Sequence, residues 1–363
     1  CYLLPHFNKG AWLMESQLLE LLREYFPEAE HIEVTGFEPI PGGYSRETYR
    51  FDAVVTSPGG EEHHPLILRK DPPPAVSILQ TSRAIEHDLI EALRMHTNIP
   101  IGRSLGHEMD AERFGEPAMV IQRMHGNSQT SDLFHDGPDV HHADDVMRHL
   151  CEVLVELHTT DVSKIDPHGR LADPRNEGID ATTWDTYMDT TIDYYIRSFP
   201  TINYDPGVTP ILDLFLTLRR DKQRPLPLVL VHGDFNPANF LYEGGRVTAL
   251  IDWENARIGD PREDLGWMTT MDILSNTDVM AHPIDEGGFL AYYNKLTGLD
   301  ITQDEVDYFT LFGTANIAVP VQAAIKRRID GESTEFTHLY LVQSAGATLP
   351  NLLRLLDYPG VPA

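Results

Sequence analysis

The sequence has few cysteines, few basic residues and no long apolar run. Its two cysteines, Cys1 and Cys151, cannot build a framework of disulfide bonds. We interpret Cys151 as a thiol in a helix core, and a reducing cytoplasm is therefore the expected location. No stretch reaches the roughly 18 apolar residues that a membrane-spanning helix needs, so the sequence predicts no such helix.

Basic residues are outnumbered two to one. The 363 residues include 28 Lys and Arg against 56 Asp and Glu, which gives a formal net charge of −28. Proteins that bind nucleic acids or anionic membranes meet phosphates with clustered Lys and Arg, so the charge argues against both kinds of partner. Apolar residues make up 41% of the chain, enough for a real core, and the acidity therefore belongs to the surface of a folded protein.

The order of the expected strands and helices predicts an α+β protein with two lobes. Strand patterns cover residues 31–40, 47–56, 64–70, 103–108 and 117–122, with a helix over 82–96. Helical patterns dominate afterwards, over 143–158, over 183–199 and from residue 265 onward. We expect an N-lobe over 31–121, a hinge over 122–126 and a helical C-lobe over 127–363. Residues 1–30 form an extension with a helix from Met14, and we interpret 1–13 as derived from cloning or as an upstream extension.

Residues 228–254 carry the clearest chemistry. Asp234 follows an apolar strand, Asn239 comes five residues later, and Asp252 ends another strand. The Gly-Gly pair at 244–245 predicts a tight hairpin turn. Pairing across that turn sets Asn239 opposite Leu250, with Asp252 diagonal to Asn239 and about 7 to 8 Å away at the backbone.

A carboxylate and a carboxamide at that distance are the hard ligands that Mg²⁺ prefers. The spacing therefore indicates a metal pair, Asn239 and Asp252, with Asp234 as a separate carboxylate in the loop before the hairpin. Any one of these residues alone is more simply a turn or strand-end residue. Their joint spacing favours a site.

The pattern H-G-D-x-x-x-x-N followed by I-D-W-E resembles the catalytic segment of the aminoglycoside phosphotransferase and choline-kinase-like group, relatives of the protein kinases. The resemblance implies a protein-kinase-like fold, with a small antiparallel sheet and one helix in the N-lobe. It implies that Asp234 is the catalytic base, that Asn239 and Asp252 hold magnesium and that His232 scaffolds the loop. The stretch G-D-P-x-x-D-L also matches the family, and we expect its Asp264 to cap the next helix.

The family's glycine loop and hinge also have counterparts. Gly43 and Ser45 belong to the loop expected to cover the nucleotide phosphates, although Arg46 stands where the family commonly has Asn. Gln122 and Met124 resemble the hinge residues whose backbone groups bind adenine.

The resemblance also implies a cation that contacts the α- and β-phosphates from the third strand of the sheet. Arg69 falls at that position, and Lys70 is the alternative. Glu86, on the helix of residues 82–96, is the expected ion-pair partner of this cation.

Residues 66–73 and 86–126 look closer to the phosphotransferase-like domains associated with acyl-CoA dehydrogenases than to antibiotic-resistance enzymes. The resemblance implies a phosphotransferase that uses Mg²⁺ and ATP, with GTP not excluded, to phosphorylate a hydroxyl group of a small molecule. The acceptor could be an apolar hydroxy compound or a hydroxyacyl derivative rather than an aminoglycoside. Several C-lobe side chains could line an apolar pocket, although their helical spacing is more typical of a core: Trp184, Tyr187, Tyr194, Tyr195, Trp267, Met268 and Met271.

Two other functions stay open at this point. The protein could be a nucleotide-binding pseudokinase or regulatory module without transferase activity, as Arg46 and the choice between Arg69 and Lys70 allow. A metal-dependent hydrolase that uses the same carboxylates is the third reading. The oligomeric state cannot be predicted from the sequence.

Overall fold

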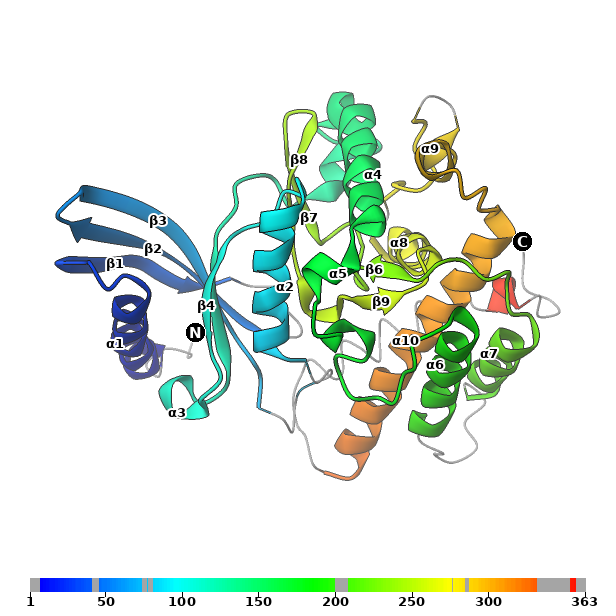
Figure 1. The fold of residues 1–363 in the computed structure, drawn as a ribbon, viewed down its shortest axis with the longest axis horizontal. Coiled ribbons are helices and arrows are strands. Elements are labelled where there is room, and N and C mark those ends of the chain that lie inside the picture. The colour runs from blue at the N-terminus through cyan, green and yellow to red at the C-terminus, as the bar shows by residue number, and fades with distance from the viewer. Residues whose placement is uncertain are drawn as a thin grey trace, which may run out of the picture.

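The structure, a computed structural model, describes residues 7–40, 46–73, 77, 81–199, 208–275, 277–284, 287–331 and 353–356. Figure 1 shows a sheet with helices at one end of the molecule and a mainly helical lobe at the other. The predicted α+β class with a sheet-containing N-lobe and a helical C-lobe is confirmed. In the described part of the chain, no helix combines the length and the apolar character needed to span a membrane.

Five antiparallel strands form the N-lobe sheet in the order β1-β2-β3-β5-β4. Because side chains alternate between the two faces of a strand, Leu66 and Leu68 of β3 lie on one face and Arg69 on the other. The strands are β1 (His31–Pro39), β2 (Glu47–Ser57), β3 (Gly60–Lys70), β4 (Ser104–Glu108) and β5 (Ala118–Gln122).

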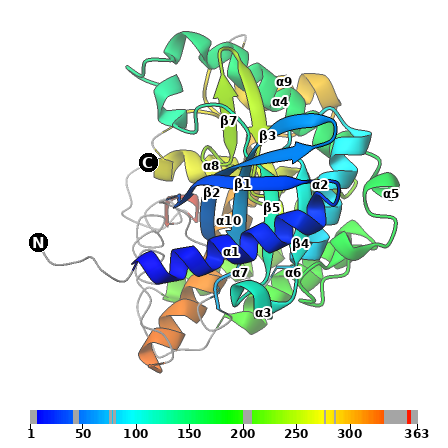
Figure 2. The same cartoon turned by 90° about the vertical axis from the view of Figure 1, so that its left-hand side faces the viewer.

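The helix α1 (Phe7–Tyr25) lies across one face of the sheet, as Figure 2 shows. It buries a leucine stripe, Leu18, Leu21 and Leu22, against strand side chains that include Phe51 and Leu66. The helix begins seven residues before Met14, so part of the segment that the sequence set apart from the fold is helical.

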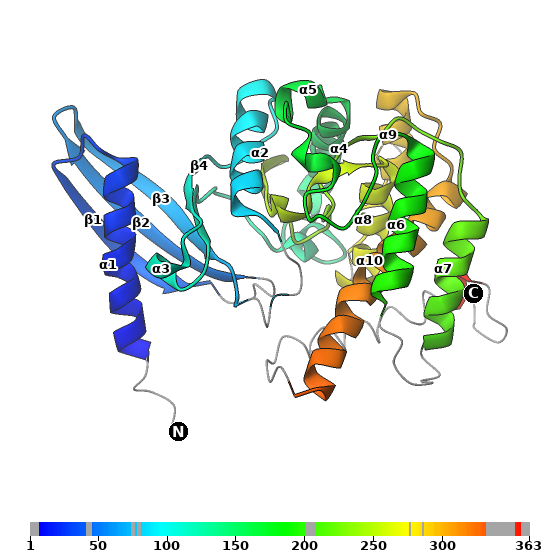
Figure 3. The same ribbon diagram turned by 60° about the horizontal axis from the view of Figure 1, so that its bottom comes forward.

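The helix α2 (Arg83–His96) stands between the sheet and the C-lobe, as Figure 3 shows. Ser82 caps it, because its hydroxyl accepts a hydrogen bond from the Ile85 N–H at 3.4 Å. Buried residues of α2 such as Leu89 and Leu93 join the large core cluster of the C-lobe, which fixes α2 to that lobe. The short helix α3 (Ala111–Phe114) connects β4 to β5.

Among the described residues, the C-lobe contains seven α-helices and two short two-stranded sheets. Four strands form two antiparallel pairs, β6 with β9 and β7 with β8. The elements are α4 (Ala143–Thr159), α5 (Val162–Ile165), α6 (Trp184–Ser198), α7 (Val208–Arg220), β6 (Val229–Val231), β7 (Phe240–Glu243), β8 (Arg246–Leu250), β9 (Arg257–Gly259), α8 (Arg262–Ser275), α9 (Gly288–Thr297) and α10 (Gln303–Ile329).

The sequence analysis did not predict α7. Pro210 lies in its first turn, where a proline is tolerated because the N–H groups there have no partner within the helix. Leu214, Phe215 and Leu218 of α7 are buried with side chains of α6 and α10, and Figure 3 shows these three helices together. Tertiary packing therefore stabilises a helix whose start looks like a loop.

The contact between α8 and α10 depends on Gly266. A Cβ atom added at this position would lie 2.4 Å from the carbonyl carbon of Phe309 in α10. We expect Gly266→Ala to lower the free energy of unfolding by about 2 kcal/mol, because the two backbones must separate. Urea denaturation measures this change. Gly59→Ala is the control, since its added Cβ would meet only the Ser57 hydroxyl at 3.6 Å, and equal stability of both variants would contradict the prediction.

Candidate active site

A polar loop, residues 232–239, connects two buried strands. It leaves β6, whose Leu230 and Val231 are fully buried, and it enters β7 at the buried Phe240. Asp252 follows β8, the partner strand of β7, and β9 then returns to pair with β6. Both ends of the loop are thus fixed in the core while its polar side chains gather beside Asp252.

The predicted register of the hairpin is wrong by one residue at its far end. Phe240, and not Asn239, pairs with Leu250, and the carbonyl of Asn239 accepts from the Ile251 N–H at 2.9 Å. A bulge between Leu241 and Tyr242 causes the shift. Thr248 is the extra residue of the partner strand, and its hydroxyl donates to the carbonyl of His125 at 2.6 Å.

The carboxylate of Asp234 accepts three side-chain hydrogen bonds. Oδ1 accepts from Nε1 of Trp267 and from Nδ2 of Asn236, both at 2.7 Å. Oδ2 accepts from Nδ2 of Asn239 at 2.9 Å, and the same amide nitrogen donates to the Asp234 carbonyl at 2.9 Å. Asp234 is therefore held in one orientation. The sequence placed Asn239 in the same loop but predicted neither hydrogen bond, and Trp267 lies 33 residues away on α8.

Burial, followed by the negative charge of Asp252, raises the pKa of the Asp234 carboxyl to about 8. The hydrogen bonds from Trp267 and Asn236 act in the opposite direction, because they stabilise the ionised form. A carboxyl group with a raised pKa beside a second carboxylate is typical of catalytic sites.

Asp252 has left-handed backbone angles, with φ 69° and ψ 61°. Its Oδ1 accepts from Nη2 of Arg69 at 2.6 Å. Burial is the largest effect and opposes ionisation of this carboxyl, but the charge and hydrogen bond of Arg69, together with the charge of Arg46, outweigh it, so the pKa of Asp252 is lowered. The site thus keeps Asp252 ionised, whereas the carboxyl of Asp234 binds a proton more tightly than a free aspartate does.

Arg69, and not Lys70, lies on the face of β3 that meets the C-lobe. Nη1 of Arg69 donates to Oε1 of Glu86 at 3.2 Å, so the ion pair that the sequence predicts is present. Lys70 lies on the face that α1 covers, and its ammonium group pairs with Glu47 at 2.8 Å.

Glu254, to which the sequence analysis gave no role, lies against three arginines of the N-lobe. Its Oε2 lies 2.5 Å from Nε of Arg46, 3.3 Å from Nη2 of Arg69 and 3.7 Å from Nη2 of Arg83. Arg46 also pairs with Asp71 inside the N-lobe, and its contact with Glu254 is the one that joins the two lobes. The departure from the family's Asn at Arg46 was the one indication of these contacts in the sequence.

The sequence predicts that Asp264 caps α8, and this prediction is wrong. Asp260 caps the helix, because its Oδ1 accepts from the Arg262 N–H at 2.9 Å while Glu263 accepts from the Asp260 N–H at 2.8 Å. Asp264 instead accepts from the N–H groups of the loop, those of His232 at 2.8 Å and Gly233 at 2.9 Å. Asp264 lies inside the first turn of α8, so its side chain is free to hold the polar loop.

His232 and His158 complete this anchor. Nε2 of His158 lies 3.0 Å from Oδ2 of Asp264, and Nε2 of His232 lies 3.0 Å from the carbonyl of Ile251 beside Asp252. Burial lowers the pKa of His232, so the ring is a neutral scaffold. His158 thus holds the side chain of Asp264, and His232 connects the loop to the end of β8.

We expect Asp264→Asn to lower the free energy of unfolding by about 2 to 3 kcal/mol. An amide has one accepting oxygen, so a buried N–H of His232 or Gly233 would lose its partner. Urea denaturation measures the loss, with the exposed Asp136→Asn as the control. A change as small as that of the control would contradict the role of Asp264 as an anchor.

Two predicted nucleotide-binding residues, Gly43 and Ser45, lie outside the described residues. At the hinge, Gln122 is the last residue of β5, and its N–H donates to the carbonyl of Arg103 at 2.8 Å. A Cβ at Gly102 would lie 2.7 Å from the Gln122 carbonyl and 3.2 Å from Cγ of Met124. Glycine at 102 therefore lets the chain pass closely beside the hinge.

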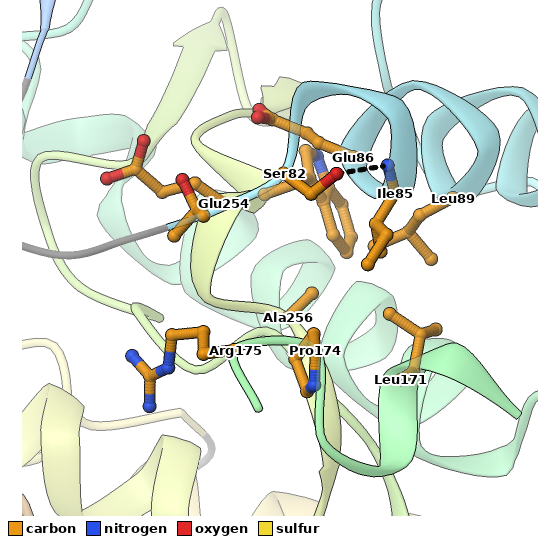
Figure 4. A pocket seen from close by; sticks show the side chains of 11 residues that line it. Ser82, Ile85, Glu86, Leu89, Leu171, Pro174, Arg175, Glu254 and Ala256 are labelled. Carbon is orange, nitrogen blue, oxygen red and sulfur yellow. Dashed lines mark hydrogen bonds between the residues drawn. The ribbon is translucent and has the colours of Figure 1, made fainter. Parts of the chain in front are cut away.

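Figure 4 shows a cavity between α2 and the C-lobe. Ser82, Ile85 and Leu89 line it from α2, while Leu171 and Pro174 line it from the opposite side. A second cavity is lined by Tyr187, Tyr194 and Tyr195 of α6, together with Arg175 and Arg257. Of the predicted apolar set, Trp184, Tyr187, Tyr195 and Met268 are buried, whereas Tyr194, Trp267 and Met271 are partly exposed.

Asn239 and Asp252 present oxygen atoms that suit a magnesium ion. Both hydrogen bonds from the Asn239 amide use Nδ2, which leaves the carboxamide Oδ1 as the oxygen for a metal. At Asp252, Oδ1 accepts a hydrogen bond from Arg69, and Oδ2 is the oxygen available for a metal among the described contacts. Mg²⁺ is usually bound through one or two such groups together with substrate phosphates, so the residues present fit this metal.

The arrangement of a five-stranded sheet, a connecting helix and a helical lobe with a polar loop is the protein-kinase-like fold. A solved structure of a thermostable mutant of aminoglycoside phosphotransferase APH(4)-Ia, in a ternary complex with AMP-PNP and hygromycin B, has this arrangement. The two superpose with a TM-score of 0.59 at 16% identity, and the match covers 96% of this chain and 100% of that chain. The family model described as "Phosphotransferase enzyme family" matches residues 36–294 of this chain. The chain therefore belongs to this family.

Hygromycin-B 4-O-kinase of Escherichia coli is 27% identical over 166 residues, which are 43% of this chain and 48% of that protein. Acyl-CoA dehydrogenase family member 10 of Mus musculus is 24% identical over 292 residues, 75% of this chain and 25% of that protein. The matched regions are thus less than half the length of these relatives. The predicted resemblance to both groups is confirmed.

Proposed function

We propose that this protein transfers the γ-phosphoryl group of ATP to a hydroxyl group of a small molecule. The observation that carries the proposal is the arrangement of the loop: Asp234 hydrogen-bonded to Asn239, beside an Asp252 that Arg69 holds ionised. Phosphoryl transfer needs little covalent chemistry from a protein and much positioning and charge neutralisation. The grouped residues supply both.

In this mechanism Asp234 is the base, and it orients the acceptor hydroxyl and receives its proton. Asn239 and Asp252 would hold Mg²⁺, which would neutralise charge on the phosphates. Arg69 supports the phosphates from β3, and Glu86 keeps its guanidinium in place. The loop with Gly43 and Ser45 would cover the phosphates, and the backbone of Gln122 and Met124 would bind the adenine.

The surroundings of Asp234 favour an apolar hydroxy compound or a hydroxyacyl derivative as the acceptor. Trp267 and Met271, four residues apart on α8, are partly exposed on the same side of this helix as the base. An aminoglycoside would need convergent carboxylates to bind its ammonium groups. The buried carboxylates of the described C-lobe already have internal partners: Asp166, Asp260, Glu263, Asp264, Asp272 and Glu305.

Production of the nucleoside diphosphate, ADP from ATP or GDP from GTP, with a panel of hydroxy compounds tests this function. The panel contains apolar alcohols, hydroxyacyl thioesters and aminoglycosides, each with ATP and with GTP, and with and without Mg²⁺. We expect Mg²⁺-dependent ADP production with an apolar or hydroxyacyl acceptor. Nucleotide binding without turnover on any acceptor would favour the pseudokinase alternative, and cleavage of phosphate esters without ATP would favour the hydrolase.

A further inference from the structure

Trp267 contacts the proposed base from a different element. It lies on α8, and its indole N–H reaches Oδ1 of Asp234 at 2.7 Å. On its other side the ring lies against α10, where a Cβ added to Gly313 would be 3.1 Å from Cε3 of Trp267. The absence of a side chain at Gly313 therefore leaves the space that the indole ring occupies.

The hydrogen bonds to Asp234 distinguish its two oxygen atoms. A carboxylate oxygen accepts about two hydrogen bonds. Oδ1 already receives two, from Trp267 and Asn236, whereas Oδ2 receives one, from Asn239. One accepting position is therefore left on Oδ2.

We propose that Trp267 is a positioning residue for phosphoryl transfer, which fills Oδ1 of Asp234 together with Asn236 and so makes Oδ2 the atom that receives the acceptor's proton. The inference rests on the proposed function and adds to it a residue and an atom. In the step itself, the acceptor oxygen bonds to the γ-phosphorus and its proton moves to Oδ2. The bond between the γ-phosphorus and the β,γ-bridging oxygen breaks, and ADP leaves with the electron pair.

The C-lobe contains a matched control for this inference. Trp184 also donates its indole N–H to a buried carboxylate, Oδ2 of Asp260, at 2.6 Å. Asp260 caps α8 and lies outside the catalytic loop. Trp184→Phe and Trp267→Phe therefore remove the same kind of hydrogen bond, and only the second of these bonds touches the base.

Steady-state kinetics of the full chain test the proposal, with water as acceptor (ATP hydrolysis) and with the acceptor found in the panel. We expect Trp267→Phe to lower kcat about 10- to 100-fold, the effect of losing one hydrogen bond to a charged group, with an unchanged KM for ATP. Binding of Mg²⁺ and AMP-PNP, measured by calorimetry, should also be unchanged. Trp184→Phe should keep the kcat of the wild type.

Two outcomes of the kinetics would overturn the inference. In one, Trp267→Phe keeps the kcat of the wild type. In the other, Trp184→Phe and Trp267→Phe lose kcat equally, which means that a structural role explains the loss. Wild-type protein that binds nucleotide but transfers phosphate to no acceptor, water included, would overturn the proposed function itself.

Gly313→Ala and an NMR measurement keep the test decisive if Trp267→Phe does not fold. An alanine at 313 would press on the indole ring, so we expect a smaller loss of kcat in the same direction. In the wild type, the ¹H–¹⁵N resonance of the Trp267 indole should move when Asp234 is replaced by Asn, while the Trp184 indole resonance stays in place. A Trp267 resonance that does not respond would contradict the contact on which the inference depends.

Discussion

Asp234→Asn should reduce phosphoryl transfer by at least about a thousandfold, within the range expected for the loss of a general base. The amide cannot take the acceptor's proton. It would also turn either its oxygen or its NH₂ group toward the Asn239 amide, which now donates to Oδ2 at 2.9 Å. The rate of transfer at saturating ATP measures the effect.

Nucleotide affinity should survive the same substitution, with a change of less than about tenfold in Kd. Asp234 is not among the groups that we propose to hold the metal or the phosphates. Calorimetric titration with Mg²⁺ and AMP-PNP measures this affinity, and Asp136→Asn serves as the exposed control. Asp234→Ala, which introduces no amide, should give the same result. Substantial turnover by either variant would remove Asp234 from the mechanism.

Asp252→Asn should weaken Mg²⁺-dependent nucleotide binding and transfer together. Asparagine tolerates the left-handed backbone of this position, φ 69°, better than alanine does, so the substitution tests the charge rather than the backbone. Loss of a charged metal ligand removes several kcal/mol of charge stabilisation, and we expect transfer to fall about a thousandfold.

The dependence of binding on the metal separates this effect from that of Asp234→Asn. For Asp252→Asn, the Kd of AMP-PNP should become nearly independent of Mg²⁺ concentration, whereas for Asp234→Asn it should keep the dependence of the wild type. Titrations at several Mg²⁺ concentrations make the comparison. An unchanged Mg²⁺ dependence in Asp252→Asn would mean that the metal binds elsewhere.

Local patterns in the sequence, together with the family resemblance, were enough to predict the fold. The family resemblance implied Arg69 on the third strand with Glu86 on the following helix as its partner, and the ion pair is present. The five-residue spacing placed Asn239 and Asp234 in a single loop, and the structure adds the hydrogen bond between them. Such short-range spacing is fixed by the chain itself.

Contacts between distant segments could not be predicted in the same way. The bulge at Thr248 depends on the neighbouring carbonyl of His125, 123 residues earlier, and it shifted the register of the hairpin. Asp264 lies in a helix turn and resembles a cap, yet its partners are the loop N–H groups 31 and 32 residues before it. Trp267 appeared typical of a core. Its indole N–H meets Asp234 only because the fold places α8 beside the loop.

The central claim is that the loop of Asp234 moves the γ-phosphoryl group of ATP onto a small molecule. ATP with labelled γ-phosphate, incubated with Mg²⁺, the protein and a pool of small hydroxy compounds, tests it most directly. We expect the label to appear in an organic phosphate ester with the wild type and not with Asp234→Asn. Label that stays in ATP, or that appears in an ester equally with both proteins, would contradict the account.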